Sequence, residues 1–247
     1  MRTLLVINPN TSESVTQLLR THVQASAGPQ VAVQAVTARF GASYIACEAS
    51  YAVAAHAALD AWAHVLAQPG PWPDAVLIGC FGDPGLLALR ESASSPVTGL
   101  AEAAFLAAAT HGRFAIVTGG ERWGPMLQRL AQALGVDRLL AGIHTVEPTG
   151  AELSSNPVWA HQLLAAACRD AATRFHAQAV ILGGAGLAGM AAAIQGAVEV
   201  PVIDSVMAGT RLALSGSLPE PERVEPGFDV TWSGVSKELV RLSRPPR

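Results

Sequence analysis

Short runs of apolar, mostly branched residues recur along the chain, each ended by glycine, proline or small polar residues. The clearest run covers residues 75–78 and leads at once into Gly-Cys-Phe-Gly and Asp-Pro-Gly, residues 79–85. An unbroken apolar run bounded by such breakers is typical of a strand buried on both faces, as in a parallel sheet. We therefore expect Cys80 at the carboxyl end of a buried strand. Asp83 as N-cap, with Pro84 at the first helical position, predicts that a helix opens there.

The rest of the pattern alternates strands with helices, which is typical of an α/β fold with parallel sheets. Further strands are expected at residues 2–7, 30–37, 95–97, 113–117, 139–146, 178–183 and 200–203. Helices are expected at about residues 12–25, 46–67, 100–109, 126–134, 158–176, 185–197, 205–214 and 233–242. Residues 147–157 and 218–228 are expected to be loops.

The second half of the chain repeats the first. Residues 179–186 align with residues 75–82, so that Cys80 falls opposite Gly184. A Pro-Val step follows each copy at nearly equal distance, and residues 4–9 pair with residues 114–119. Such a repeat predicts two similar units, although alanine- and glycine-rich chains also produce matches of this kind by chance. We expect two pseudo-symmetric α/β lobes, residues 1–97 with 208–247 and residues 98–207, and an active site in the cleft between them.

Composition excludes several classes of protein. Half of the 247 residues are apolar and only 14% are charged, which favours a homo-oligomer that buries part of this surface. A net charge of −3 without a basic cluster outside the C-terminus argues against nucleic acid as a partner. The apolar runs are too short for a signal peptide or a membrane span. Three cysteines without metal-ligand spacing favour a reducing cytoplasm and no metal site.

A second interpretation of the repeat is open at this point. Residues 184–189 fit G-x-G-x-x-G after a strand, and Asp204 ends the next strand about 20 residues later, as a dinucleotide-binding fold requires. Against it, the first copy occupies the same place without that motif. A fold that binds a small molecule without this cofactor is the simpler expectation.

Four motifs resemble one family. They are Val-Ile-Asn-Pro-Asn-Thr-Ser (6–12), Phe-Gly-Ala-Ser-Tyr-Ile (40–45), Ile-Gly-Cys-Phe-Gly-Asp-Pro-Gly-Leu (78–86) and Val-Thr-Gly-Gly-Glu-Arg-Trp (117–123). Together they are similar to the hydantoin and allantoin racemases of the aspartate/glutamate racemase superfamily. The resemblance implies two α/β lobes, no cofactor, no metal and two cysteines that face each other across the substrate Cα. Cys80 matches one of them, but the chain has Gly184 where the second cysteine would stand.

The resemblance implies that Cys80 is an acid/base thiol and that Gly184 is a vacant partner position. The expected substrate-binding residues are Asn8, Asn10, Tyr44, Phe81, Gly82, Thr118, Gly119, Gly120, Trp123, Ala185 and Gly186. A thiolate can remove a proton from Cα, and backbone amides can stabilise the enolate that forms. Asp83, as a neighbouring carboxylate, would raise the thiol pKa unless it is engaged as a helix cap.

With one thiol, four interpretations stay open. The protein is a racemase of a cyclic ureide or amino-acid derivative that uses water or another group on the second face, or a decarboxylase of malonate-like acids. Arylmalonate decarboxylase, of the same superfamily, also has one such thiol, in the opposite lobe. Otherwise the chain is a non-catalytic relative that binds a small ligand, or Gly184 is an engineered change in a racemase. We expect the racemase-type isomerase first.

Overall fold

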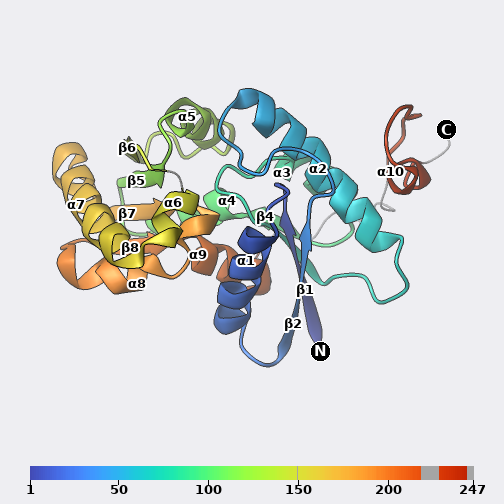
Figure 1. The fold of residues 1–247 in the computed structure, drawn as a ribbon, viewed down its shortest axis with the longest axis horizontal. Coiled ribbons are helices and arrows are strands. Elements are labelled where there is room, and N and C mark those ends of the chain that lie inside the picture. Colours follow the sequence, from blue (N-terminus) through green and yellow to red (C-terminus); the bar gives the residue numbers. More distant parts are fainter. Residues whose placement is uncertain (149, 218–227, 244–247) are drawn as a thin grey trace.

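The strands form two separate four-stranded sheets, and every pairing within them is parallel. A computed structural model of the protein describes residues 1–148, 150–217 and 228–243. The first sheet has the order β2 (Val31–Thr37), β1 (Arg2–Asn8), β3 (Ala75–Ile78) and β4 (Val97–Gly99). The second has the order β6 (Leu140–Val146), β5 (Phe114–Gly119), β7 (Ala179–Gly183) and β8 (Val202–Asp204). The sheets belong to two lobes (Figure 1).

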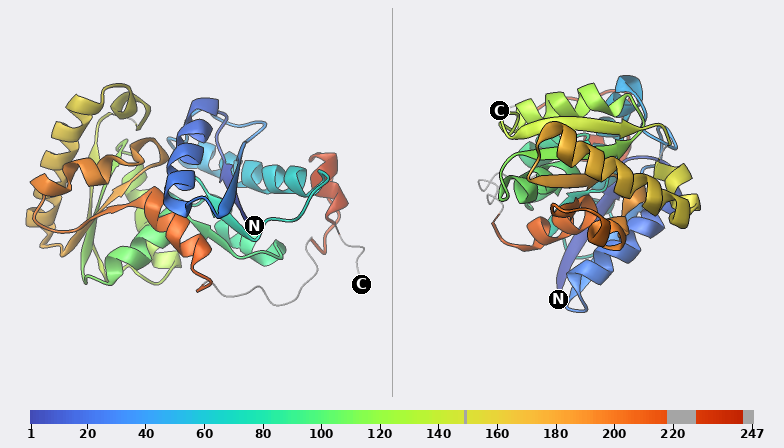
Figure 2. Two further views of the ribbon diagram at one scale, coloured as in Figure 1. Left: turned by 90° about the horizontal axis from the view of Figure 1, so that it is seen from below. Right: turned by 90° about the vertical axis from the view of Figure 1, so that its left-hand side faces the viewer.

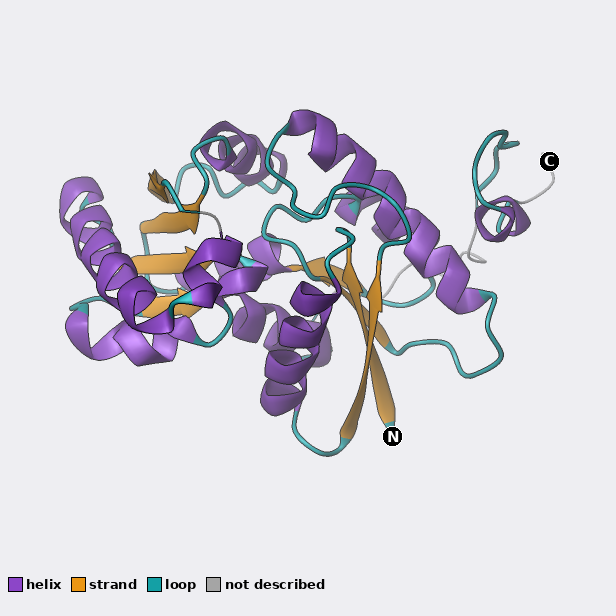
Figure 3. Cartoon of the chain, viewed as in Figure 1, coloured by secondary structure: helices purple, strands orange, loops and turns teal. Residues whose placement is uncertain are grey.

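Helices cover both sheets (Figure 3). In the first half of the chain they are α1 (Glu13–Ala27), α2 (Glu48–Leu66), α3 (Leu86–Ser92) and α4 (Leu100–Ala109). The second half has α5 (Trp123–Ala133), α6 (Gly150–Ser155), α7 (Pro157–Phe175), α8 (Met190–Ile194), α9 (Ser205–Leu214) and α10 (Lys237–Arg241). Two short 3₁₀ helices, η1 (Ala185–Leu187) and η2 (Gln195–Ala197), flank α8. The α/β fold with two lobes is therefore confirmed.

The register of the strands confirms the internal repeat. Leu4 pairs with Ala75 in the first sheet, and Phe114 pairs with Ala179 in the second. The Pro-Val steps also correspond, because Val97 pairs with Val76 and Val202 with Val180. Residue 99 of the first lobe thus corresponds to residue 204 of the second, and each is followed by a ten-residue helix, α4 or α9.

One continuous apolar core joins the lobes. The helices α4 and α9 lie between the sheets and contact strands of both (Figure 1). On α4, the ring of Phe105 stacks on Phe114 of β5 with centroids 5.8 Å apart and meets Phe81 edge-on at 6.1 Å. Separate apolar clusters fill the outer face of each sheet. A shared core of this kind resists separation of the lobes, since parting them would expose these rings to water. The proposed division at residues 97/98 and 207/208 stays a prediction.

Two elements differ from the expectation. Asp83 does not cap the helix that follows it, because its backbone is left-handed, with φ of +52°, and α3 begins only at Leu86 after Gly85. The expected loop at 147–157 contains α6, and Asn156 caps α7 through its side chain. Short polar segments such as this one carry too weak an apolar period to be identified as helical.

Smaller differences concern element boundaries. The expected helix at 185–197 is three short turns, η1, α8 and η2, because Gly189 begins α8 in the left-handed conformation. The terminal helix is limited to α10. The expected connection at 218–228 lies outside the described residues, apart from Phe228. Among the described residues, none of the helices is long and apolar enough to cross a membrane.

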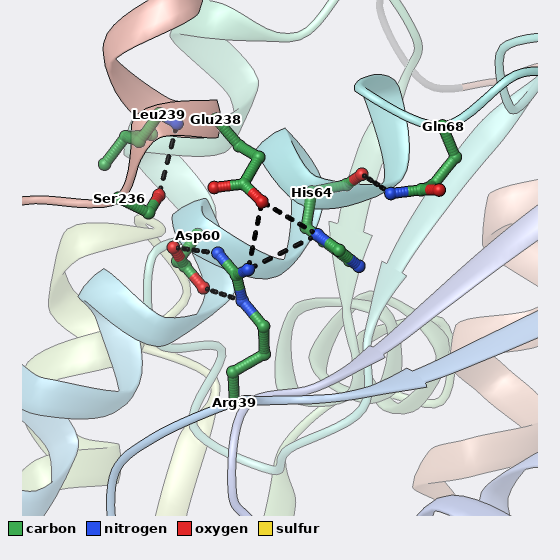
Figure 4. A network of polar contacts seen from close by, with 7 residues as sticks. All are labelled: Arg39, Asp60, His64, Gln68, Ser236, Glu238 and Leu239. Atoms are coloured by element: carbon green, nitrogen blue, oxygen red, sulfur yellow. Dashed lines mark hydrogen bonds and ion pairs between the residues drawn. The ribbon is translucent and has the colours of Figure 1, made fainter.

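A polar network attaches α10 to the first lobe (Figure 4). Arg39 donates two hydrogen bonds to the buried carboxylate of Asp60 on α2, at 2.9 and 2.8 Å. The same guanidinium donates to Glu238 of α10 at 3.1 Å, and Glu238 also lies 3.3 Å from His64. The pKa of Glu238 falls to about 2, because it accepts hydrogen bonds from its own backbone amide, from Arg39 and from His64. Figure 2 shows α10 at the end of the first lobe that lies farthest from the second.

Candidate active site

A cavity of about 420 Å³ lies between the lobes, at the carboxyl ends of the strands. Ligands of parallel α/β sheets bind at this edge. The first lobe supplies Asn10, Ser12, Ser14, Val15, Leu18, Ser43, Tyr44, Ile45, Gly79, Cys80 and Phe81. The second supplies Thr118, Gly119, Trp123, Gly183, Gly184, Ala185, Gly186 and Leu187. Cys80 and Gly184 therefore border one cavity, as the alignment of the two halves predicts.

Cys80 reaches the cavity because β3 ends two residues before it. The amide of Gly79 still donates to the Ile7 carbonyl at 2.8 Å, which continues the ladder with β1, and the chain then turns away. The Cys80 side chain is almost wholly buried, with 8% of the residue exposed. Burial raises its pKa well above the ordinary value, and the nearby Asp83 carboxyl raises it further. At neutral pH the group is therefore a thiol, which is able to donate a proton.

The turn after β1 presents Asn10 to the cavity while Asn8 holds it in place. The Asn8 amide is fully buried and donates to Asn10 Oδ1 at 2.9 Å and to Thr16 Oγ1 at 3.0 Å. Asn10 Oδ1 also accepts from the Ser12 amide at 2.9 Å. Ser12 in turn caps α1. Asn8 thus lies behind the lining, in a supporting position.

In the second lobe, the position that corresponds to Cys80 is Gly184, which has no side chain. Gly184 has φ of +150°, a region that side-chain-bearing residues rarely adopt, and its amide donates to Ser205 Oγ at 3.2 Å. A Cβ built on Gly184 would lie 3.3 Å from Leu187 Cγ. Cys80 is not among the residues with positive φ, so the two halves differ in backbone at this position. The side chain of Leu187 therefore partly fills the space that the side chain of a second cysteine would need.

Aromatic side chains from both lobes border the cavity. The hydroxyl of Tyr44 donates to the Gly119 carbonyl at 3.5 Å across the cleft. The ring of Trp123 packs on Gly82, whose carbonyl accepts from the Tyr51 hydroxyl at 2.7 Å. Burial raises the pKa of Tyr51 far above the ordinary value, so it remains a neutral donor. Gly82 and Gly120 support these rings and are outside the lining.

Besides the Cys80 thiol, the described lining carries hydroxyl, amide and apolar groups and no Lys, Arg, His, Asp or Glu. Among the described residues, His, Cys, Asp and Glu side chains also form no group of three that could hold a metal ion. Sequence reasoning missed several lining residues, chiefly Ser14, Val15 and Leu18 on the first turns of α1 and Leu187 on η1. For the three residues of α1, the signal was present in the helix that follows the Asn-Pro-Asn turn, because a helix that starts at the cleft must present its first turns there.

The structure argues against the dinucleotide-binding interpretation, because the carboxylate of Asp204 is already engaged within the protein. Asp204 caps α9 by accepting from the amides of Val206 and Met207, and its other oxygen accepts from Gly189 at 2.8 Å. The carboxylate is buried and both oxygens are engaged within the lobe. It is therefore not presented to a ribose, as that interpretation requires.

Fold and site together define a two-lobed α/β protein with a small-molecule cavity between pseudo-symmetric halves. The description "Asp/Glu/Hydantoin racemase" belongs to a family model that matches residues 4–213. The chain belongs to this family and is an enzyme of the racemase type. A hydantoin racemase of Pseudomonas sp. (strain NS671) is 30% identical over 209 residues, which cover 84% of this chain and 83% of the relative.

Solved structures agree with this assignment. The allantoin racemase from Klebsiella pneumoniae has a TM-score of 0.86 and 30% identity, and the match covers 98% of this chain and 99% of that one. Arylmalonate decarboxylase has a TM-score of 0.59 at 18% identity, with 86% of this chain and 91% of that chain covered. This second likeness concerns the fold alone.

Proposed function

We propose that the protein is a cofactor-independent isomerase that acts at the Cα of a hydantoin, allantoin or amino-acid-derived substrate, with Cys80 as its acid/base. The observation that carries the proposal is that Cys80 and Gly184, the matched positions of two halves, border the same cavity. Family membership and the likeness to named hydantoin and allantoin racemases support the reaction class.

Cys80 would exchange the Cα proton from one face. Its thiolate takes the Cα proton, the resulting thiol exchanges that proton with solvent, and the thiol then donates a solvent-derived proton back to the enolate carbon. Backbone amides around Phe81, Gly119 and Ala185 border the cavity and could stabilise the enolate oxygen as it develops. Since burial favours the protonated thiol, the thiolate is the scarce form at neutral pH. We therefore expect activity to rise with pH.

Gly184 supplies no proton on the other face, so inversion requires water or a hydroxyl group. The lining of the second lobe, on the side of Gly184, includes Thr118, whose hydroxyl is a hydrogen-bond donor. General acid–base help from one positioned side chain contributes about 10²–10⁴-fold to a rate. Exchange of the Cα proton with solvent should accordingly be faster than inversion.

The lining favours a neutral ring over a doubly charged acid. A cyclic ureide offers N–H and C=O groups that Asn10, Thr118 and the backbone amides can pair with, and its apolar substituent fits against Val15, Leu18 and Trp123. A malonate would bring two carboxylates into a cavity whose described lining has no cation. Hydroxyl and amide donors alone would have to replace its hydration.

Decarboxylation of malonate-like acids is the second candidate, and one observation favours it. A single buried thiol that is protonated at neutral pH is suited to protonate an enolate on one face after loss of CO₂. The decarboxylase whose fold the chain shares is consistent with this chemistry on the same scaffold.

The test incubates the enzyme in D₂O with enantiopure 5-substituted hydantoins and allantoin, and separately with aryl- and alkylmalonates. Deuterium at Cα is measured by NMR, inversion by polarimetry, and CO₂ release by a coupled assay. We expect deuterium incorporation that exceeds inversion and is lost, by at least 10²-fold, in Cys80→Ala. The matched control is Cys47→Ala, because Cys47 is the N-cap residue of α2 and lies outside the cavity lining.

Each other outcome has a definite meaning. Full exchange in Cys80→Ala would discard the role of the thiol. CO₂ release without exchange would favour the decarboxylase. Binding of a hydantoin, detected by a change in tryptophan fluorescence, together with no activity in either assay would favour a non-catalytic relative.

A further inference from the structure

Asp83, three residues after Cys80, occupies an unusual place. Its carboxyl is buried, and both of its oxygens accept hydrogen bonds from the first turn of α4, Oδ1 from the Ala101 amide at 2.9 Å and Oδ2 from the Glu102 amide at 2.7 Å. Its own amide donates to the Cys80 carbonyl at 3.1 Å, which closes the turn that carries the thiol. Asp83 therefore connects the Cys80 turn directly to the N-terminus of α4.

This arrangement constrains the neighbouring backbone. The carboxyl lies so close to Gly99 that a Cβ there would be 2.1 Å from Asp83 Cγ. Asp83 itself has φ of +52°, a conformation that is unfavourable for most side chains although Asp tolerates it better than most. Neither feature is needed to cap α4. A Ser, Thr, Asp or Asn at position 99 could have capped this helix without them.

The second lobe shows that the fold does not require this placement. There, the residue that corresponds to Gly99 is Asp204, which caps α9 directly, and the residue that corresponds to Asp83 is Leu187. In each lobe, one carboxylate thus accepts hydrogen bonds from the first backbone amides of the helix between the sheets, Asp83 for α4 and Asp204 for α9. In the lobe with the thiol, that carboxylate belongs to Asp83, in the turn that follows β3. In the other lobe it belongs to Asp204, the residue directly before α9.

Few other charges face this cluster. From α4, Glu102 accepts from Arg90 of α3 at 2.6 Å and from Thr98 at 2.8 Å, which satisfies it as an ion pair. From α2, the neutral Tyr51 hydroxyl points at the Gly82 carbonyl. Farther out, Arg129 of α5 pairs with Glu48 of α2 at the surface. Asp83 is therefore a carboxyl near the thiol that, within the part of the chain that the structure describes, accepts from backbone amides and forms no ion pair.

We propose that Asp83 is a positioning residue that fixes the Cys80 turn on α4 and, by its negative charge, holds Cys80 in the thiol form. The N-terminus of a helix carries a partial positive charge that would otherwise stabilise a thiolate. The carboxylate neutralises that charge and adds a repulsion of its own. Since both Asp83 oxygens are engaged by backbone amides, the carboxyl does not itself reach the substrate. The inference deepens the proposed function and rests on it for its catalytic meaning.

Burial raises the pKa of Asp83 to about 7, against the opposing effect of the two amide bonds. Above neutral pH, Asp83 is therefore charged, and its repulsion disfavours ionisation of the Cys80 thiol. Removing the charge should lower the pKa of Cys80 and make the thiolate more abundant.

The test is alkylation of the full chain by iodoacetamide at fixed pH values between 7 and 9, followed by peptide mass spectrometry. Cys80 in Asp83→Asn should react faster than in wild type at each pH, by about threefold for each unit by which its pKa falls. Thiolate abundance rises tenfold per unit, while its nucleophilicity declines in part. Cys47, partly exposed, and Cys168, buried in the second lobe, are references within the same sample.

Two controls make the result decisive. Glu102→Gln removes a neighbouring charge that Arg90 already neutralises, and should leave the Cys80 rate within twofold. If Asp83→Asn does not fold, as judged by circular dichroism and by the Cys168 rate, Asp83→Ser is used, because serine can still accept from α4. An unchanged Cys80 rate in a folded variant would overturn the proposal.

The readout needs no substrate, so it is independent of the proposed reaction. Faster alkylation of Cys80 together with full exchange activity in Cys80→Ala would sustain the electrostatic role of Asp83 and reject the isomerase assignment. In active enzyme, the pH profile of kcat/KM in Asp83→Asn should move to lower pH. A purely structural role would lower the rate without moving the profile.

Discussion

The ring of Phe81 lies against the backbone of Gly183, so that the residue after Cys80 in one lobe contacts the residue before Gly184 in the other. A Cβ built on Gly183 would lie 2.2 Å from Phe81 Cε1. This contact fixes how far apart the two strand ends stand. The spacing of the cleft therefore depends on an aromatic ring and on the absence of a side chain opposite it.

Gly183→Ala should force the ring or the lobes to move. Overpacking of this kind lowers the free energy of unfolding by about 1–3 kcal/mol. Urea denaturation measures the change, and Gly196→Ala, where an added Cβ meets nothing within 4 Å, is the matched control. Combining Gly183→Ala with Phe81→Leu should recover part of the loss. If the effects of the two substitutions on the free energy of unfolding were strictly additive, this would contradict the contact between Phe81 and Gly183.

Gly184→Cys should raise inversion relative to exchange, because it returns a proton donor to the second face. The structure limits how far inversion can increase in this variant. A side chain at φ of +150° is strained by about 1–3 kcal/mol, and Leu187 must give way. Gly184→Ala carries the same strain without a thiol. A ratio of inversion to exchange that is equal in the two variants would count against the correspondence of residues 80 and 184.

Stability should fall as the pH rises from about 4 to about 7, through the titration of Asp83. Its folded pKa of about 7 lies above the value of an unfolded Asp, so the folded state binds the extra proton and loses that stabilisation as the proton leaves. One such proton changes the free energy of unfolding by about 1.4 kcal/mol per pH unit. Thermal melts of wild type and Asp83→Asn measure it. Parallel curves for the two proteins would refute this titration.

Arg39→Met should destabilise the protein far more than Glu238→Gln. Without Arg39, the buried Asp60 carboxylate loses its ion pair, a change that typically lowers stability by about 3–5 kcal/mol. Glu238 is more exposed, and its removal should lower stability much less, because ion pairs near the surface contribute little. Arg129→Met, which breaks the exposed pair with Glu48, is the surface control. Equal effects of all three variants in urea denaturation would show that burial of Asp60 is not the cause.

Much of this protein was predictable from the sequence alone. The apolar runs located the strands, and the matching of Ala75 with Ala179 anticipated the common register of the two sheets. The helices after β4 and β8 were predicted with their observed bounds, residues 100–109 and 205–214. These features succeed because a buried strand or an apolar helix needs a local pattern of residues that the sequence states directly.

The role of Asp83 could not be predicted in the same way. An Asp-Pro pair indicates a cap for the helix that follows, but the carboxylate here caps α4, which begins 17 residues later at Leu100. Likewise, the lining side chains of α1 and η1, the ring of Phe81 on Gly183 and the strained backbone of Gly184 depend on how the lobes meet. Local sequence determines which segments are strands and helices and which positions carry a thiol or lack one. Contacts between distant segments are decided only when the two sheets pack on α4 and α9, because that packing sets which groups are buried together.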